Sequence, residues 1–121
     1  GSNMLIGQSL AGLFAAEILL KKPKLFKDYV IMSPSLWWNN TSLLTQMPVA
    51  PSPNTRVYIA VGKEGKMMVG DAKKLARLIK KKHVPEQVFF EYLPDEDHGT
   101  ILHPAVGNAF KLWFEKKRRL Q

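Results

Sequence analysis

Four short apolar segments alternate along the chain with longer segments whose apolar residues recur at helical spacing. The apolar segments predict buried strands over residues 4–6, 28–33, 56–61 and 87–93. Helical spacing predicts helices over residues 9–22 and 71–82, a short helix over 41–46, and a long amphipathic helix over about 104–119. In the last helix we expect four buried side chains, Ala105, Phe110, Trp113 and Phe114. Prolines mark two boundaries, because Pro23 ends the first helix and Pro104 suits the first turn of the last one.

The regular alternation of strand and helix predicts an α/β fold built on a parallel sheet. Strands that are apolar almost throughout imply that helices cover both faces of that sheet. The length predicts a single domain over residues 4–121. We interpret Gly1-Ser2-Asn3 as an expression scar, because a secretory signal would begin with a charged segment.

The net charge of +8 comes from 18 Lys and Arg residues against 10 Asp and Glu residues. The basic residues gather near the ends of expected helices, at 21–27, 73–82 and 116–119, where cations complement the helix dipole. The Trp and Phe residues lie in apolar segments and not among the basic residues, so a stacking platform for nucleic acid is not expected. We therefore interpret the charge as a solvated basic surface, with no nucleic-acid partner.

Composition excludes several other classes of protein. A hydrophobic share of 45% excludes an intrinsically disordered chain. The longest mostly apolar stretch, residues 10–20, contains Glu17 and is too short to cross a bilayer, so no membrane partner is expected. The absence of cysteine excludes disulfides, thiolate nucleophiles and thiolate metal sites. The compartment stays open, with the cytoplasm or periplasm of a bacterium as the expectation.

The segment Gly7–Gly12 (GQSLAG) lies where the first strand turns into the first helix. A nucleophile elbow needs small neighbours at such a turn, and it pushes its serine out at the C-terminal edge of the sheet. Gly7 and Ala11 supply small neighbours to Ser9, although glycine is usual at the position of Ala11. The helix N-terminus also offers N–H groups to an oxyanion, that of Leu10 being best placed. The alternative is that Ser9 only caps the helix, and the motif alone does not decide between them.

Of the three histidines, His98 is the candidate general base. It follows the last expected strand, so it lies at the same C-terminal edge as Ser9, where catalytic groups of parallel sheets collect. His83 follows a lysine run, and we expect it to be a solvated partner of a helix dipole. His103 precedes a proline and is expected to cap or pack locally.

An orienting acid is expected between the serine and the histidine in sequence. Glu64 fits, because it follows the strand over residues 56–61 and so lies at the same edge. The alternative is a solvated glutamate paired with Lys63 or Lys66. Asp97 and Asp95 are the fallback acids, and an acid supplied from outside the chain, or none, stays open. Together these residues predict a serine that attacks an acyl carbon and a histidine that carries its proton.

The sequence resembles the Putative esterase family of α/β-hydrolases, which includes enterochelin (siderophore) esterases, S-formylglutathione hydrolase-like enzymes and feruloyl-type carbohydrate esterases. The enterochelin esterase-like branch is the most similar. Four segments carry the resemblance: GQSLAGLFAAEILLKKPKLF (7–26), MSPSLWW (32–38), VGKEG (61–65) and DEDHGTILHPA (95–105).

The resemblance implies an esterase without a cofactor that acts on a small-molecule ester. It implies that Ser9 is the nucleophile, His98 the base and Glu64 the acid. It also places Trp37 and Trp38 near the acyl pocket, with ordinary hydrophobic packing as the alternative for both. The identity of the ester is not set by these residues.

The likeness covers nearly the whole chain but only the second half of the family's fold. The earlier strands, and the loop that gives the second oxyanion N–H, have no counterpart here. The first strand is therefore expected to present a bare edge, through which copies of the chain would associate. Two functions stay open: a serine esterase, or a truncated and inactive α/β-hydrolase fragment that associates through this edge.

Overall fold

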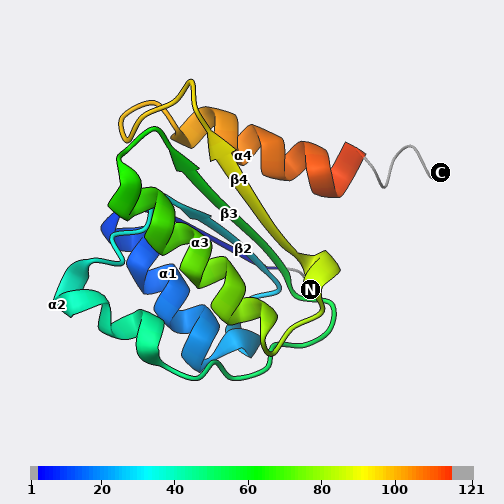
Figure 1. Ribbon diagram of the computed structural model, residues 1–121. Coiled ribbons are helices and arrows are strands. Elements are labelled where there is room, and N and C mark those ends of the chain that lie inside the picture. Colours follow the sequence, from blue (N-terminus) through cyan, green and yellow to red (C-terminus); the bar gives the residue numbers. More distant parts are fainter. Residues whose placement is uncertain (1–2, 116–121) are drawn as a thin grey trace.

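A computed structural model describes residues 3–115, in which four parallel strands form one sheet in the order β1-β2-β3-β4 (Figure 1). The strands are β1 (Met4–Gln8), β2 (Asp28–Met32), β3 (Arg56–Gly62) and β4 (Val88–Leu93). The α-helices are α1 (Leu10–Lys21), α2 (Trp38–Thr41), α3 (Lys66–Lys80) and α4 (Leu102–Phe110). Short 3-10 turns lie at η1 (Pro23–Leu25), η2 (Ser42–Thr45) and η3 (Pro85–Gln87), and a π-helical turn, η4 (Lys111–Glu115), continues α4. None of the helices in the described part of the chain is long and apolar enough to cross a membrane.

These elements confirm the predicted α/β fold. Each strand lies within two residues of its predicted bounds, while α3 begins five residues earlier than predicted. In the first two predicted clusters, Lys21 lies in the last turn of α1 and Arg77 and Lys80 lie in the last turn of α3, whereas Lys73 and Lys74 lie in the middle of α3 and not at its end. The third cluster and the predicted end of the last helix, at 116–119, lie outside the described residues.

The strands are paired so that their C-terminal ends lie at nearly one level. Gln8 pairs with Met32, Met32 with Ala60, and Ala60 with Glu91. Because all four strands run in the same direction, the segments that follow them emerge at one edge of the sheet. This register brings together residues that are up to 90 positions apart in the chain.

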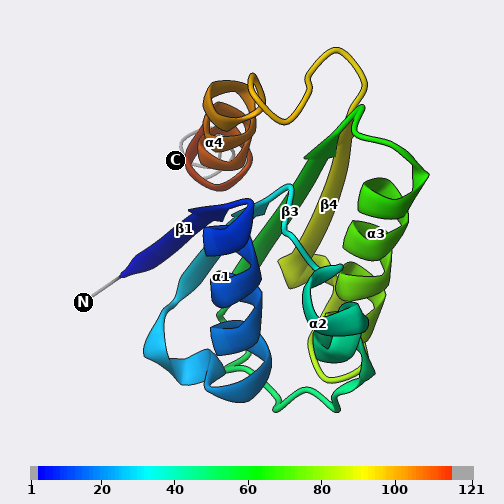
Figure 2. The same ribbon diagram turned by 90° about the vertical axis from the view of Figure 1, so that its left-hand side faces the viewer.

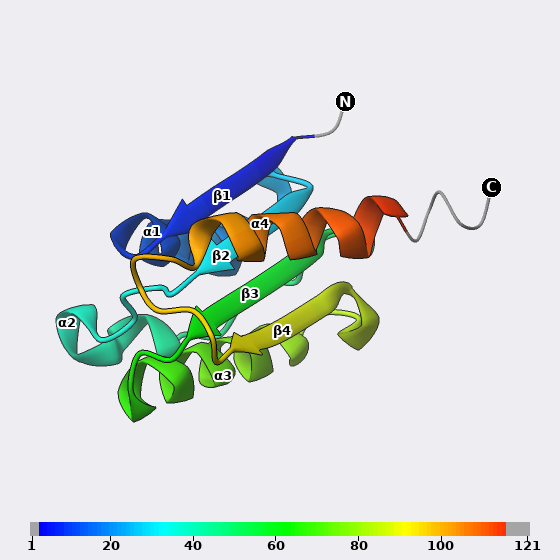
Figure 3. The same cartoon turned by 90° about the horizontal axis from the view of Figure 1, so that it is seen from above.

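Helices cover both faces of the sheet, as predicted, but unequally. Figure 2 shows α1 and α3 on one face and α4 on the other, and Figure 3 shows α4 running across the middle of the sheet. The interior strand β2 is buried along its whole length, whereas β1 has β2 as its one neighbour in the described sheet and leaves Ile6 42% exposed. The predicted bare edge of the first strand is therefore present in this structure.

Asn3, the first described residue, contacts the segment that leads into β2. Asn3 accepts hydrogen bonds from the backbone N–H groups of Lys27 and Asp28, and its side-chain amide donates to the carbonyl of Leu25. Residues 1 and 2 lie outside the described residues, so the interpretation of residues 1–3 as a scar stays a prediction.

The expected buried side of the last helix is wrong for two of its four residues. Ala105 and Ala109 are fully buried against the sheet and Trp113 packs beside them, which gives a stripe at intervals of four residues. Phe110 and Phe114 follow this stripe by one position, about 100° further round the helix, and are 41% and 43% exposed. The two alanines determine which side of the helix faces the sheet, because small side chains let the helix approach the sheet closely.

His83 is also placed differently from its prediction as a solvated residue. Its side chain is 8% exposed, and its Nε2 lies 2.6 Å from the carbonyl oxygen of Thr55 in the segment before β3. His83 therefore joins the end of α3 to the start of β3, far from the edge that carries the other candidates. His103 lies exposed in the first turn of α4.

Candidate functional site

Ser9 occupies the sharp turn between β1 and α1. Its backbone has φ 61° and ψ −120°, a conformation that costs a non-glycine residue about 1–3 kcal/mol. Three backbone hydrogen bonds hold the turn. The Ser9 N–H donates to the carbonyl of Met32 at 3.0 Å, and the Ser9 carbonyl accepts from the N–H groups of Leu13 at 3.0 Å and Ser35 at 3.1 Å. These hydrogen bonds hold Ser9 in its strained backbone conformation.

The small neighbours of Ser9 have different roles. A Cβ atom at Gly7 would lie 2.4 Å from the carbonyl oxygen of Ala11, so glycine is required there. At Gly12, a Cβ atom would lie 3.1 Å from the carbonyl oxygen of Met32, which also favours glycine. The methyl group of Ala11 is exposed, which explains why the turn accepts alanine where the motif usually has glycine.

The alternative interpretation of Ser9 as a helix cap is not supported. Ser9 stands at the N-cap position of α1, but its side chain makes no capping hydrogen bond. Its Oγ lies instead 3.3 Å from the Oγ of Ser35, a buried residue in the segment after β2. The hydroxyl is therefore directed away from the helix end and toward the C-terminal edge of the sheet.

Glu64 and His98 are in direct contact at this edge. The Nδ1 atom of His98 lies 2.6 Å from Oε1 of Glu64, and the Glu64 side chain is 5% exposed against 48% for His98. The second carboxylate oxygen, Oε2, accepts hydrogen bonds from the Ser33 hydroxyl at 2.6 Å and from the Gly62 N–H at 2.8 Å. Three donors therefore hold a buried carboxylate in one orientation.

The contacts of the acidic candidates separate them clearly. Asp97 points away from the ring of its neighbour His98, and its Oδ1 accepts hydrogen bonds from the N–H groups of Gly99 at 2.8 Å and Thr100 at 3.1 Å. Asp97 thus shapes the loop that carries the histidine. Asp95 is exposed. Of the acids weighed from sequence, Glu64 is the one that contacts His98.

Gln8 connects the serine turn to the histidine loop. Its side-chain Nε2 donates to the backbone carbonyl of His98 at 2.7 Å, across 90 positions of sequence. A Cβ atom at Gly62 would lie 2.5 Å from the carbonyl of Glu96, so the same loop also packs closely on the end of β3. The loop is held from two strands.

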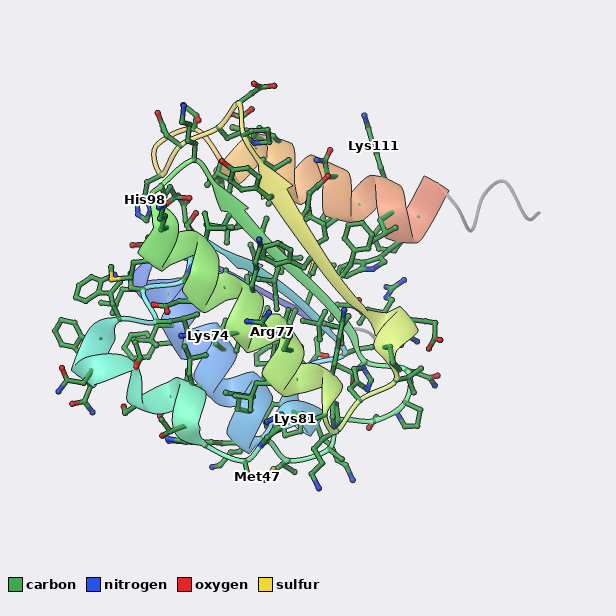
Figure 4. The ribbon with its side chains drawn as sticks, viewed as in Figure 1. Met47, Lys74, Arg77, Lys81, His98 and Lys111 are labelled. Atoms are coloured by element: carbon green, nitrogen blue, oxygen red, sulfur yellow. The ribbon has the colours of Figure 1, made fainter. Side chains whose placement is uncertain are left out.

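An open depression of about 460 Å³ contains Ser9, Glu64 and His98 together, and Ser35, Trp37 and Met68 also line it. Figure 4 shows His98 at the end of the sheet where the strand arrowheads point, near the start of α3. Lys63 and Asp97 complete its lining. The depression is open to solvent.

The two tryptophans lie on different surfaces. Trp37 lines the depression that holds Ser9, whereas Trp38 lines an adjoining groove of about 370 Å³ with Leu10 and Phe14. Their rings are 5.9 Å apart and both are about half exposed, so neither is packed in the core. Their position relative to an acyl pocket stays a prediction.

Leu10 begins α1 directly after Ser9, and the first N–H groups of a helix have no partner within it. Its role as an oxyanion donor stays a prediction. Within residues 3–115 no group of three or more His, Asp or Glu side chains is arranged to hold a metal ion.

Sequence reasoning missed three side chains of this site: Gln8, Ser33 and Ser35. Ser33 and Ser35 stand in the MSPSLWW segment, but their partners lie 31 and 26 positions away. Only the strand register shows which serine faces which partner, so the motif alone could not assign them.

The structure thus combines a parallel sheet, a strained serine turn and a histidine–glutamate contact at one edge. Comparison with known proteins agrees on the fold. The model of the family described as Putative esterase matches residues 1–113, and the chain belongs to this family.

The chain spans about half the length of the relatives it matches. The siderophore enterobactin esterase of Emericella nidulans is 27% identical over 139 residues, which covers 90% of this chain and 46% of that protein. The crystal structure of the BES protein from Bacillus cereus has a TM-score of 0.68 at 28% identity, over 87% of this chain and 42% of that one. An IroE-like serine hydrolase from Shewanella oneidensis shares the fold, with a TM-score of 0.71 at 21% identity over 95% and 40% of the chains.

Proposed function

We propose that this chain is a serine carboxylic-ester hydrolase in which Ser9, His98 and Glu64 form a catalytic triad. The observation that carries the proposal is the 2.6 Å contact between His98 and a buried Glu64, in the same depression as a serine at a strained strand-to-helix turn. A buried carboxylate on Nδ1 leaves Nε2 of the ring to serve the nucleophile. Membership in an esterase family supports the same reaction class.

The proposed reaction has two steps through an acyl-enzyme. His98 accepts the Ser9 hydroxyl proton on Nε2 while Oγ forms a bond to the ester carbonyl carbon. The tetrahedral intermediate then collapses, the bond to the leaving alcohol breaks, and His98 gives that alcohol its proton. Water repeats the sequence on the acyl-enzyme and releases the acid. Glu64 stabilises the imidazolium formed in each step.

The oxyanion of the intermediate is assigned to the Leu10 N–H, because this group lies in the first turn of α1 directly after the nucleophile. One donor of this kind is typically worth about 10²–10³-fold in rate.

The substrate class we propose is an ester of a siderophore. Its support comes from the relatives, one of which is named a siderophore enterobactin esterase and another a ferri-bacillibactin esterase from Bacillus subtilis. The second resemblance covers 40 residues, 33% of this chain, at 45% identity.

Hydrolysis of p-nitrophenyl acetate tests the reaction class. We expect a rate above that of Ser9→Ala and of His98→Ala, each measured at matched concentration because surface lysines also react slowly with this ester. Equal rates for all three proteins would refute the proposed esterase activity.

A second candidate is an inactive hydrolase fragment that associates through β1. The free edge of β1 and the span of half the relatives' length favour it. Sedimentation would then show a dimer that Ile6→Lys weakens, since a charge on an edge strand opposes pairing. A monomer whose hydrolysis depends on His98 would contradict this candidate.

A further inference from the structure

We propose that Ser33 and Ser35 are positioning residues, one for each end of the proposed catalytic set. The inference rests on the proposed function, because it assigns Ser33 to the acid and Ser35 to the nucleophile. The two serines flank Pro34 in the segment directly after β2, the strand that lies between those carrying Ser9 and Glu64. A single short segment therefore reaches both neighbours.

Ser33 acts on the carboxylate. It is fully buried, and its hydroxyl donates to Oε2 of Glu64 at 2.6 Å, opposite the oxygen that faces His98. The Ser33 N–H donates to the carbonyl of Ala60 at 2.8 Å, and its φ of 44° lies in the left-handed region. The backbone is thus held in an unusual conformation that directs the hydroxyl at the acid. With Oε2 occupied, the carboxylate cannot rotate away from the ring.

Ser35 acts on the nucleophile. Ser35 is 5% exposed, its Oγ lies 3.3 Å from Oγ of Ser9, and its N–H donates to the carbonyl of Ser9 at 3.1 Å. Ser35 therefore contacts both the backbone and the side chain of the strained residue. In the described structure the Ser9 hydroxyl is partnered by Ser35 while His98 is partnered by Glu64, so Ser35 holds the nucleophile's rotamer before a substrate arrives.

Pro34 makes the segment a rigid spacer. A Cβ atom at Gly12 would lie 3.1 Å from the Cα of Pro34, so the segment packs directly on the first turns of α1. The φ of proline is fixed by its ring, which removes one degree of freedom between the two serines. The distance between nucleophile and acid is consequently set by this segment as well as by the sheet register.

Saturation kinetics with a fluorophosphonate test the Ser35 assignment. Ser35→Ala should lower the maximal inactivation rate about 3–10-fold and leave the inhibitor's KI unchanged. The variant loses the orientation of the Ser9 hydroxyl, whereas binding of the inhibitor is not affected. Ser52→Ala is the matched control, since this serine lies in the connector before β3, away from the depression, and its carbonyl accepts the backbone N–H of Thr55. A general structural defect would instead change KI and the melting temperature together.

Proton NMR tests the Ser33 assignment without any need for activity. A histidine Nδ1–H that is hydrogen-bonded to a buried carboxylate gives a protected, downfield resonance. Ser33→Ala should broaden or abolish this resonance of His98, while Ser35→Ala and Ser52→Ala should keep it. Crystal structures provide the parallel readout for Ser35→Ala, in which the Ser9 side chain should occupy more than one rotamer.

The outcomes separate the two levels of the proposal. If the fluorophosphonate does not label the wild-type chain, the proposed esterase activity is refuted. The positioning roles are then decided by the His98 Nδ1–H resonance and the Ser9 rotamer, neither of which needs activity. The positioning roles are overturned if the wild type is labelled and Ser33→Ala and Ser35→Ala both behave like Ser52→Ala. The three readouts are the inactivation rate, the His98 resonance and the Ser9 rotamer. The proposed esterase activity would remain.

Discussion

The acid–base pair and the nucleophile lie at the same edge of the sheet, but their surroundings differ. Glu64 follows the interior strand β3, is nearly buried, and receives hydrogen bonds from His98, Ser33 and Gly62. Ser9 follows the edge strand β1, and within the described residues its hydroxyl has one hydrogen-bond partner, Ser35 at 3.3 Å.

The difference shows which part of the site the described chain completes by itself. The acid–base pair is fixed by groups that follow β2, by the end of β3 and by the loop after β4, and the Gln8 side chain at the end of β1 also holds this loop. The nucleophile is fixed through its backbone, but the outer side of β1 has no neighbour in the described sheet. We therefore expect side-chain substitutions in the acid–base pair to act on chemistry, and changes that force the backbone apart in either half, at Gly62 or at Gly7, to act on folding as well.

The largest effect is expected from Glu64→Gln. The variant has nearly the same shape, but its amide cannot accept three hydrogen bonds as the carboxylate does, and the histidine loses its charged partner. The rate of ester hydrolysis should fall about 10²–10⁴-fold. A rate within threefold of wild type would place the acid elsewhere.

Gly7→Ala and Gly62→Ala place the same steric conflict in the two halves of the site. Each new Cβ atom would lie 2.5 Å or less from a carbonyl oxygen. Each variant should lower the free energy of unfolding by about 1–3 kcal/mol, as measured by urea denaturation.

Gly70→Ala is the control for both glycine variants, because a Cβ atom there meets nothing within 4 Å and the residue lies inside α3. It should raise the free energy of unfolding by about 0.5–1 kcal/mol. Equal stability of all three variants would show that the close contacts at Gly7 and Gly62 do not exist.

Gln8→Leu should have a smaller effect, since it removes one hydrogen bond between the two halves. Loss of the donor to the His98 carbonyl should lower the hydrolysis rate about 3–10-fold, a cost near that of one hydrogen bond. The matched control is Gln87→Leu, whose amide also donates to a backbone carbonyl, that of Pro53, but away from the site. If both variants slow the reaction equally, Gln8 does not connect the halves.

The smallest effect is expected from Asp97→Ala. This carboxylate caps the loop through Gly99 and Thr100 and does not contact the ring of His98, so the rate should change less than about threefold. A loss comparable with that of Glu64→Gln, measured with the same ester, would show that Asp97 shares the acid's role.

Local sequence signals were sufficient for the framework of this molecule. Apolar segments bounded by proline and glycine located the strands, and small residues around Ser9 indicated the turn. Because parallel strands end at one edge, the positions of Ser9, Glu64 and His98 after three strands were enough to expect them at the same edge, and the structure places all three in one depression.

Features that depend on contacts between distant segments could not be predicted. His83 is buried because the carbonyl of Thr55, 28 positions earlier, lies beside the end of α3. Phe110 and Phe114 are exposed because two alanines, and not the larger residues, face the sheet. Periodicity marks an amphipathic helix but does not say which side a close approach will favour.

The most direct test of the central claim is the site of covalent modification by a fluorophosphonate, located by peptide mass spectrometry. The account predicts one adduct per chain on Ser9, absent from Ser9→Ala and strongly reduced in His98→Ala. An adduct on another residue, or labelling of Ser9→Ala equal to that of the wild type, would contradict it.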